Sequence, residues 1–307
     1  MRGRIPPDSG AGQMPSTRGL VIPAPVRRVF GAVQAVSSSF AARLAERWFF
    51  TPPRRPLTSE GKAFLRSGQP FAVRVDHRTV AGWTWGAGPV VYLVHGWGGR
   101  AGRWDAFVRP LVQSGYTVVT FDAPGHGESG RGLSSMPGFA RALQGVAQRH
   151  GPARAVIAHS FGAGAVALAA RWGLVMDRVA LLAPVADPSA FAEAFATALG
   201  ARPDVMARLR TNSERRLGMR WTDVDVCAAA PHMSAPLLVV HDRDDVVVPL
   251  AEGAGIAASW PGARLFSTNG LGHRGVLRDP RVIAEVLQFV AGAATTTGLS
   301  QSRGVTT

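Results

Sequence analysis

Short apolar runs rich in β-branched residues alternate with helical segments through most of the chain, and this alternation constrains the fold more than any other feature. The first two runs form a strand pair, and five of the others are apolar enough for strands covered by helices on both faces. Repeated strand and helix units with right-handed crossovers build an open sheet. We therefore predict an α/β fold with a mainly parallel eight-stranded sheet flanked by helices. The expected strands lie at 71–75, 80–85, 90–96, 116–122, 154–160, 178–184, 236–242 and 263–269.

The alternation is interrupted once, by a segment without strand signals at 187–233. A connecting loop of that length is uncommon, so we expect a helical cap inserted over the edge of the sheet. The α/β core is then expected to comprise residues 57–186 and 234–292.

Both ends of the chain lack apolar periodicity, so we expect disordered tails at 1–25, which is basic, and at 293–307. Between the first tail and the core, 26–56 is expected to hold one amphipathic helix followed by a Pro-rich linker, because proline ends a helix. The apolar stripe of that helix has spacings of 4, 3, 4, 4 and 4 residues and consists of Val29, Val33, Val36, Phe40, Leu44 and Trp48.

The chain carries a net charge of +14, and Lys62 is its only lysine. Residues 1–66 hold eleven Lys or Arg and three acids, which leaves the core only moderately basic. Such a charge suits an anionic partner, and it equally suits an arginine-rich compositional bias. We expect no nucleic-acid partner, and we keep contact of the basic amino-terminal segment with a membrane surface as the alternative.

Cys227 is the only cysteine, which excludes an intramolecular disulfide and a metal site built from several cysteines. No apolar run approaches the ~18 residues of a membrane-spanning helix. The pair Arg27 and Arg28 resembles a twin-arginine export signal, but Arg43 and Arg47 would interrupt its apolar core. We therefore expect a cytoplasmic protein, with export as the alternative.

The segment RAVIAHSFGAGAV places a serine where an apolar strand ends and a small-residue helix begins. A nucleophile on such a strained turn needs small neighbours two residues before and after it. Gly162 fills one of these positions and Ala158 the other, so Ser160 is the candidate nucleophile. Taken alone, the same serine also fits an ordinary helix cap.

Glycine-rich loops follow the two strands before it. In HGWGG, Gly96 and Gly98 allow backbone N–H groups to point into a cleft, and the N–H groups of Trp97 and Phe161 are candidates for an oxyanion hole. The position of His95 ahead of the glycines favours a role in shaping this loop over a role as general base.

The next loop, FDAPGHGESG, lacks the spacing of a phosphate-binding or dinucleotide motif. Its polar residues Asp122, His126 and Ser129 are expected to shape the loop by hydrogen bonds.

The remaining two candidates lie after the last two strands. Asp245 is the preferred acid, because it stands just past a strand end where a carboxylate can orient an imidazole. Asp242, Asp244 and Asp187 are the alternatives. His273, in a glycine-rich loop, is the expected base, and the order Ser, Asp, His along successive strand ends supports the choice.

These motifs and their order resemble the α/β-hydrolase fold superfamily of esterase- and lipase-like serine hydrolases, over roughly residues 70–292. Two positions depart from the usual pattern. Ala158 stands two residues before the serine, where the usual motif has glycine. Asp242 stands where glycine is frequent in the turn that carries the acid. The motifs that carry the resemblance are HGWGG, FDAPGHGES, AHSFG, HDRDD and GLGHR.

The resemblance implies a mechanism without cofactor or metal. His273, oriented by Asp245, removes the proton from Ser160 as it attacks a carbonyl, the amides of Trp97 and Phe161 stabilise the oxyanion, and water releases the acyl group.

Several reactions fit this scheme. The serine argues against epoxide and halide chemistry, for which relatives use an aspartate. We expect a small-molecule ester or thioester with an apolar acyl group, and keep carbon–carbon bond hydrolysis, perhydrolysis and a non-catalytic binding protein as alternatives. The apolar preference rests on cap residues that could line a pocket, namely Phe191, Phe195, Met206, Leu209 and Trp221.

Overall fold

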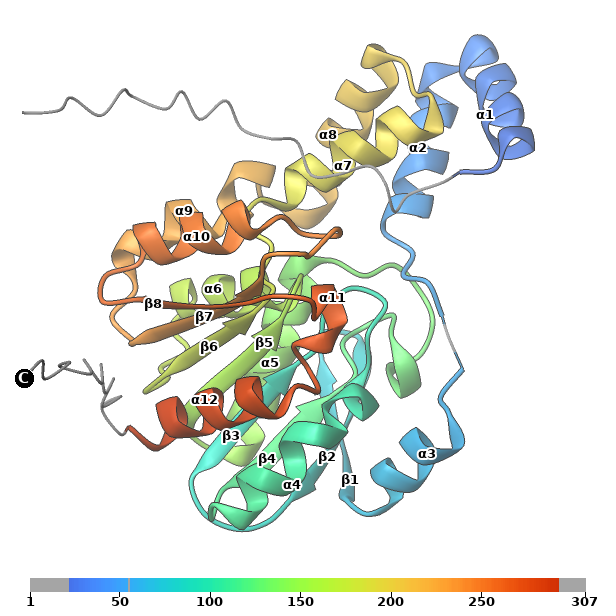
Figure 1. Ribbon diagram of the computed structural model, residues 1–307. Helices are drawn as coiled ribbons and strands as arrows, with labels where there is room; N and C mark the ends of the chain where they lie inside the picture. The colour runs from blue at the N-terminus through green and yellow to red at the C-terminus, as the bar shows by residue number, and fades with distance from the viewer. Residues whose placement is uncertain (1–21, 55, 293–307) are drawn as a thin grey trace, which may run out of the picture.

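The computed structural model describes residues 22–54 and 56–292, which contain a single eight-stranded sheet (Figure 1). The strand order is β1-β2-β4-β3-β5-β6-β7-β8. The pairs β1–β2 and β2–β4 are antiparallel and the remaining pairs are parallel, which confirms the predicted mainly parallel sheet. The strands are β1 Gln69–Val75, β2 Arg78–Trp85, β3 Val90–Val94, β4 Thr117–Phe121, β5 Ala153–His159, β6 Val179–Leu182, β7 Leu237–Asp242 and β8 Arg264–Thr268.

Helices cover both faces of this sheet, as the apolar strands predict. In β3, Val91 and Leu93 pack on one face while Tyr92 and Val94 pack on the other, because successive side chains in a strand point in opposite directions. The first face is covered by α4 Asp105–Gln113 and α12 Pro280–Ala291, and the second by α5 Met136–His150, α6 Gly162–Arg171 and α10 Leu250–Ser259. Shorter elements are α3 Ser59–Arg66, which the sequence did not predict, η2 Ala101–Trp104, η3 Gly127–Ser129 and α11 Gly272–Gly275.

The segment between β6 and β7 forms only helices in the structure. Its two long helices, α7 and α8, pack with the two helices that open the described chain, α1 and α2 (Figure 1, upper right). This helical layer has its own buried cluster, which includes Phe30, Leu199 and Leu209. The elements are α1 Ala24–Val36, α2 Ser38–Phe49, α7 Pro188–Leu199, α8 Pro203–Leu217, η4 Trp221–Val224, α9 Val226–Ala229 and η5 Ala230–His232.

The single helix expected after residue 26 is wrong, because the chain breaks at Ser37. Ser37 is extended, with φ −154°, and its hydroxyl accepts a hydrogen bond from Phe40 N as the cap of α2. The break changes the helical phase, so only part of the predicted stripe packs inward: Val33, Leu44 and Trp48 pack against the buried cluster of this layer. Val29 and Val36 are 61% and 89% exposed, and the buried positions are Phe30, Ala41, Ala42 and Ala45.

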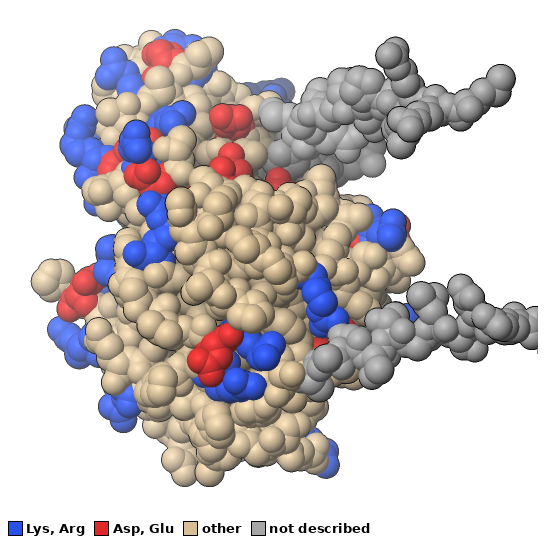
Figure 2. Space-filling view, turned by 90° about the vertical axis from the view of Figure 1, so that its left-hand side faces the viewer, with Lys and Arg blue, Asp and Glu red and all other residues tan. Residues whose placement is uncertain are grey.

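Polar contacts join the amino-terminal helices to the helical segment between β6 and β7. Gln34 bonds with both Gly200 O and Arg202 N, and Arg216 forms a 2.7 Å ion pair with Glu46. Figure 2 shows arginine and acidic side chains mixed over this lobe, above a largely uncharged area. The net charge of the chain therefore does not form one continuous basic surface on this face.

The Pro-rich linker lies against the loops that follow β3 and β4. Arg54 donates to Gly127 O at 2.7 Å, and Phe50 O accepts from Ser134 N at 2.8 Å. Pro53 packs so closely on Gly98 that a Cβ there would lie 2.8 Å from Pro53 Cγ. The linker is thus a packed part of the structure.

The predicted disordered tails fall mostly outside the described residues, at 1–21 and 293–307, whereas α1 already begins at Ala24. Among residues 22–54 and 56–292, no helix is long and apolar enough to cross a membrane.

Candidate active site

Ser160 stands on a strained turn between β5 and α6. Its φ is +55°, a left-handed conformation that non-glycine residues rarely adopt and that exposes a side chain at a sharp turn. A Cβ on Gly162 would lie 2.8 Å from His95 O, so glycine is required where the turn approaches β3. Ala158 is fully buried between Val94 and Leu181 of the neighbouring strands, and its methyl group is accommodated.

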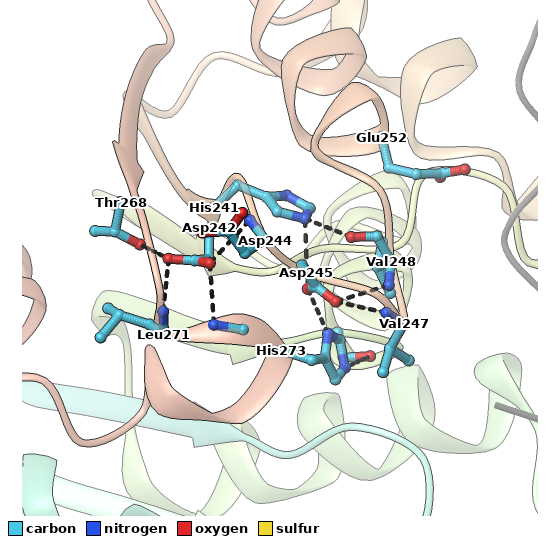
Figure 3. Close-up of polar contacts among 12 residues, drawn as sticks. His241, Asp242, Asp244, Asp245, Val247, Val248, Glu252, Thr268, Leu271 and His273 are labelled. Carbon is cyan, nitrogen blue, oxygen red and sulfur yellow. Dashed lines mark hydrogen bonds and ion pairs between the residues drawn. The ribbon is translucent and has the colours of Figure 1, made fainter. Parts of the chain in front are cut away.

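The structure brings the three side chains chosen from the sequence into one chain of contacts. His273 Nε2 lies 3.1 Å from Ser160 Oγ, and His273 Nδ1 lies 2.8 Å from Asp245 Oδ2. Figure 3 shows the His273 ring beneath the Asp245 carboxylate. A base within hydrogen-bond distance of a hydroxyl, itself oriented by a carboxylate, can activate that hydroxyl as a nucleophile.

The Asp245 carboxylate is held ionised although its side chain is fully buried. Burial alone would raise its pKa, but the interactions with His241 and His273 and the N–H of Val248 outweigh burial and lower the pKa. Oδ1 accepts from Val247 N at 2.8 Å and Val248 N at 2.9 Å, which leaves Oδ2 directed at His273.

The other candidate acids have different positions. Asp187 caps α7 by accepting from Ser189 N at 2.8 Å. Asp244 is exposed and accepts from Gly270 N. Asp242 is buried and accepts from the backbone N–H groups of Leu271 and Gly272, and it does not contact the His273 ring.

The two backbone N–H groups named from the sequence as oxyanion donors are those of Trp97 and Phe161. Among the described residues, neither Trp97 N–H nor Phe161 N–H has a hydrogen-bond acceptor. Gly98 has φ +65°, which turns the loop after Trp97 as the glycine-rich motif predicts. Gly96 lies against Ser160, since a Cβ at Gly96 would be 2.9 Å from Ser160 Cβ.

His95 shapes this loop through backbone contacts at both ring nitrogens. Nδ1 donates to Gly96 O at 2.7 Å, and Nε2 accepts from Ala123 N at 3.0 Å. Burial lowers the pKa of His95 to about 4, so the ring is neutral near pH 7. His126 is likewise neutral, because burial and the His95 ring lower its pKa to about 3, and its Nε2 accepts from Gly98 N.

Asp122 connects the two glycine-rich loops. Its carboxylate accepts from Ala101 N at 2.7 Å and Glu128 N at 2.8 Å, and its carbonyl accepts from the Ser129 hydroxyl. Burial raises the pKa of Asp122, and the two N–H groups oppose that rise.

Two histidines beside Ser160, Asp245 and His273 were not identified from the sequence. His159 Nε2 donates to His273 O at 2.8 Å. Burial, and to a lesser degree the nearby His273 ring, lower the pKa of His159 to about 3. His241 is fully buried, donates from Nε2 to Val248 O at 2.9 Å and lies 3.6 Å from Asp245 Oδ2. In the sequence, His159 directly precedes Ser160 and His241 stands four residues before Asp245, and these positions could have pointed to them.

Of the five residues that could line a pocket, Met206 and Trp221 line a surface pocket formed by residues of α7 and α8. Phe195, Met206, Leu209 and Trp221 belong to the cluster formed with α1 and α2, whereas Phe191 is only half-buried. In the described residues, no group of three or more His, Cys, Asp or Glu side chains is arranged to hold a metal ion.

Comparison with known proteins places this site in a family context. A family model described as "Alpha/beta hydrolase family" matches residues 91–286. A dihydrolipoyllysine-residue acetyltransferase component of the acetoin cleaving system from Cupriavidus necator is 36% identical over 130 residues, which are 38% of this chain and 33% of that protein. A non-heme haloperoxidase from Rhodococcus erythropolis is 32% identical over 198 residues, or 63% of this chain and 62% of that protein.

Solved structures share the fold at low identity. A thermophilic esterase from Thermogutta terrifontis superposes with a TM-score of 0.57 at 18% identity, covering 73% of this chain and 98% of that one. Helices α1 and α2 precede the segment matched by the family model, whereas α7 and α8 lie within it.

Proposed function

Because the chain belongs to the alpha/beta hydrolase family, we propose that it is a serine hydrolase that cleaves carboxylic esters or thioesters. The observation that carries this proposal is the continuous contact from Ser160 Oγ through His273 to Asp245, with distances of 3.1 and 2.8 Å. The shared fold of a solved esterase structure is consistent with this proposal.

The reaction begins when Ser160 Oγ attacks the carbonyl carbon and His273 Nε2 takes the hydroxyl proton. The negative charge that develops on the carbonyl oxygen is bound by the N–H groups of Trp97 and Phe161. Each preorganised donor of this kind contributes roughly 3 kcal/mol to the transition state. His273 then protonates the leaving alcohol or thiol, and an acyl group remains on Ser160.

Hydrolysis of the acyl-enzyme reverses the proton path. His273 removes a proton from water, the hydroxide attacks the acyl carbon, and Ser160 leaves with the proton returned by His273. Asp245 stays ionised throughout and stabilises the imidazolium, as its lowered pKa favours.

The surroundings of Ser160 support an apolar acyl group. The rings of Trp97 and Phe161 lie 5.2 Å apart beside the proposed oxyanion hole. Val246 and Val247 of the acid turn are 69% and 43% exposed, and Figure 3 shows Val247 beside His273. These side chains, rather than the cap residues named from the sequence, are proposed to contact the acyl chain.

The haloperoxidase relative favours one second reaction, perhydrolysis. In that reaction hydrogen peroxide replaces water at the acyl-enzyme and yields a peracid from the same intermediate. The same active-site residues would serve both reactions.

Initial rates on p-nitrophenyl esters of increasing chain length, and on the matching thioesters, test the proposal. Wild-type protein is expected to hydrolyse at least one series, with longer acyl chains preferred, whereas Ser160→Ala is expected to be inactive. A parallel assay with acetate and peroxide measures peracid formation. Equal rates for the wild type and Ser160→Ala on every substrate would refute the proposed function.

A further inference from the structure

Asp242, the last residue of β7, accepts several hydrogen bonds through its carboxylate, although it is not one of the three proposed catalytic residues. The residue is fully buried. Oδ2 accepts from Thr268 Oγ1 at 2.7 Å and Leu271 N at 3.1 Å, and Oδ1 accepts from Gly272 N at 3.0 Å and Asp244 N at 3.0 Å. Four donors therefore converge on one carboxylate, as Figure 3 shows.

These donors join two loops that are distant in the sequence. Three of them belong to the histidine loop, which we define as residues 268–273, and lie 26 to 30 residues after Asp242. The fourth belongs to the acid turn that carries Asp245. Asp242 thus connects the segment that ends in His273 to the segment that holds its carboxylate partner.

The histidine loop needs such a connection because its own backbone is permissive. Gly270 and Gly272 have φ of +77° and +61°, and a Cβ at either position would meet nothing within 4 Å. Glycine loses more conformational freedom on ordering than any other residue, so a loop with two of them has no intrinsic preference for one position. The N–H of Gly272, immediately before His273, is bound by Asp242.

The side chain must be an ionised carboxylate to satisfy all four donors. Burial alone would raise the pKa of Asp242, but the hydrogen bonds from Thr268, Gly272 and Leu271 outweigh burial and lower it. Asparagine would turn an NH₂ group toward one of the backbone N–H groups, and glycine would leave every donor without this partner.

We propose that Asp242 is a positioning residue that fixes the histidine loop on the acid turn, and so holds His273 at the distance from Ser160 that proton transfer requires. This inference rests on the proposed function for its catalytic consequence. Asp242 acts through His273 and does not touch the substrate.

The test compares full-length variants Asp242→Asn, Asp242→Gly and Thr268→Val with the control Asp279→Asn. Asp279 also accepts two backbone N–H groups, from Arg281 and Val282, but it caps α12, and asparagine is an equally good cap. The readouts are kcat and KM for a p-nitrophenyl ester, with sites counted by fluorophosphonate titration, and the midpoint of thermal unfolding.

The Asp242 variants are expected to lose roughly 10- to 100-fold in kcat with KM little changed, because displacement of a reacting group by about 1 Å can cost ~100-fold. Thr268→Val should lose a smaller factor, and it should add little when combined with Asp242→Gly, since both changes remove the same contact. Asp279→Asn should retain wild-type kcat.

A role confined to fold stability would lower the unfolding midpoint and leave kcat per titrated site unchanged, and that result would overturn the proposal. If the Asp242 variants do not fold, Thr268→Val decides, and an unchanged kcat refutes the proposal. If wild-type protein shows no Ser160 reactivity, the proposed function fails separately. Amide hydrogen exchange then tests the positioning role without an activity assay. The proposal predicts faster exchange at Leu271 and Gly272 in Thr268→Val than in the wild type, and unchanged exchange would refute it.

Discussion

Replacing Gly96 with alanine tests whether the oxyanion loop and the elbow are packed as closely as the structure indicates. The added methyl group would lie 2.9 Å from Ser160 Cβ, 3.0 Å from His159 O and 3.3 Å from His159 Nδ1. Ser160 cannot retreat cheaply, because its N–H donates to Leu182 O at 3.0 Å and its φ is already +55°. The loop that carries Trp97 must therefore move instead.

The expected cost follows from these contacts. Overpacking a well-packed site costs about 1–3 kcal/mol of unfolding free energy. Displacing the proposed oxyanion donor by a few tenths of an ångström, in a site where misplacement by about 1 Å costs ~100-fold, should lower kcat by roughly 3- to 10-fold. Urea unfolding and kcat per titrated site measure the two effects separately.

Gly31→Ala is the matched control. Gly31 lies within α1, and a methyl group added there would meet nothing within 4 Å. Alanine there should stabilise the protein by roughly 0.5–1 kcal/mol without a change in kcat. If Gly96→Ala retains both wild-type kcat and wild-type stability, the close packing of the loop on Ser160 is wrong.

Two further predictions concern the elbow and the buried histidines. Ala158→Gly should retain kcat within about twofold and lose about 1 kcal/mol of stability from backbone freedom and the lost methyl group; a large loss of activity would show that the Ala158 side chain matters to catalysis. The pKa of His95 is lowered to about 4, and those of His126 and His159 to about 3, so below pH 6.5 the unfolded chain takes up protons before the folded one. Stability is therefore complete above pH 6.5 and lost as the pH falls towards 4, by about 1.4 kcal/mol per histidine between pH 7.5 and 5.5. An unfolding free energy that is equal at the two pH values contradicts the buried neutral state.

The sheet and the three central side chains could be predicted because their signals are local. Apolar runs mark each strand, and Ser160, Asp245 and His273 each follow a strand end. In a parallel sheet these ends meet at one edge, so order along the chain predicts proximity in space. The distances of 3.1 and 2.8 Å agree with that reasoning.

The features that were missed depend on contacts between distant segments. The break at Ser37 is a local cap, but the position of α2 depends on its packing against α8, which no periodicity in α2 encodes. The contact of His159 with His273 O spans 114 residues, and the Asp242 contacts depend on how two loops meet. The sequence identified Asp242 as unusual without indicating its partners.

Fluorophosphonate labelling of the native full-length protein, followed by mass spectrometry of the labelled peptide, tests the central claim most directly. A single adduct is expected on Ser160, absent from heat-unfolded protein and slowed about a thousandfold or more in His273→Ala, since triad residues act as a unit. Failure of Ser160 to react, or equal labelling of wild type and His273→Ala, would contradict an activated serine at this site.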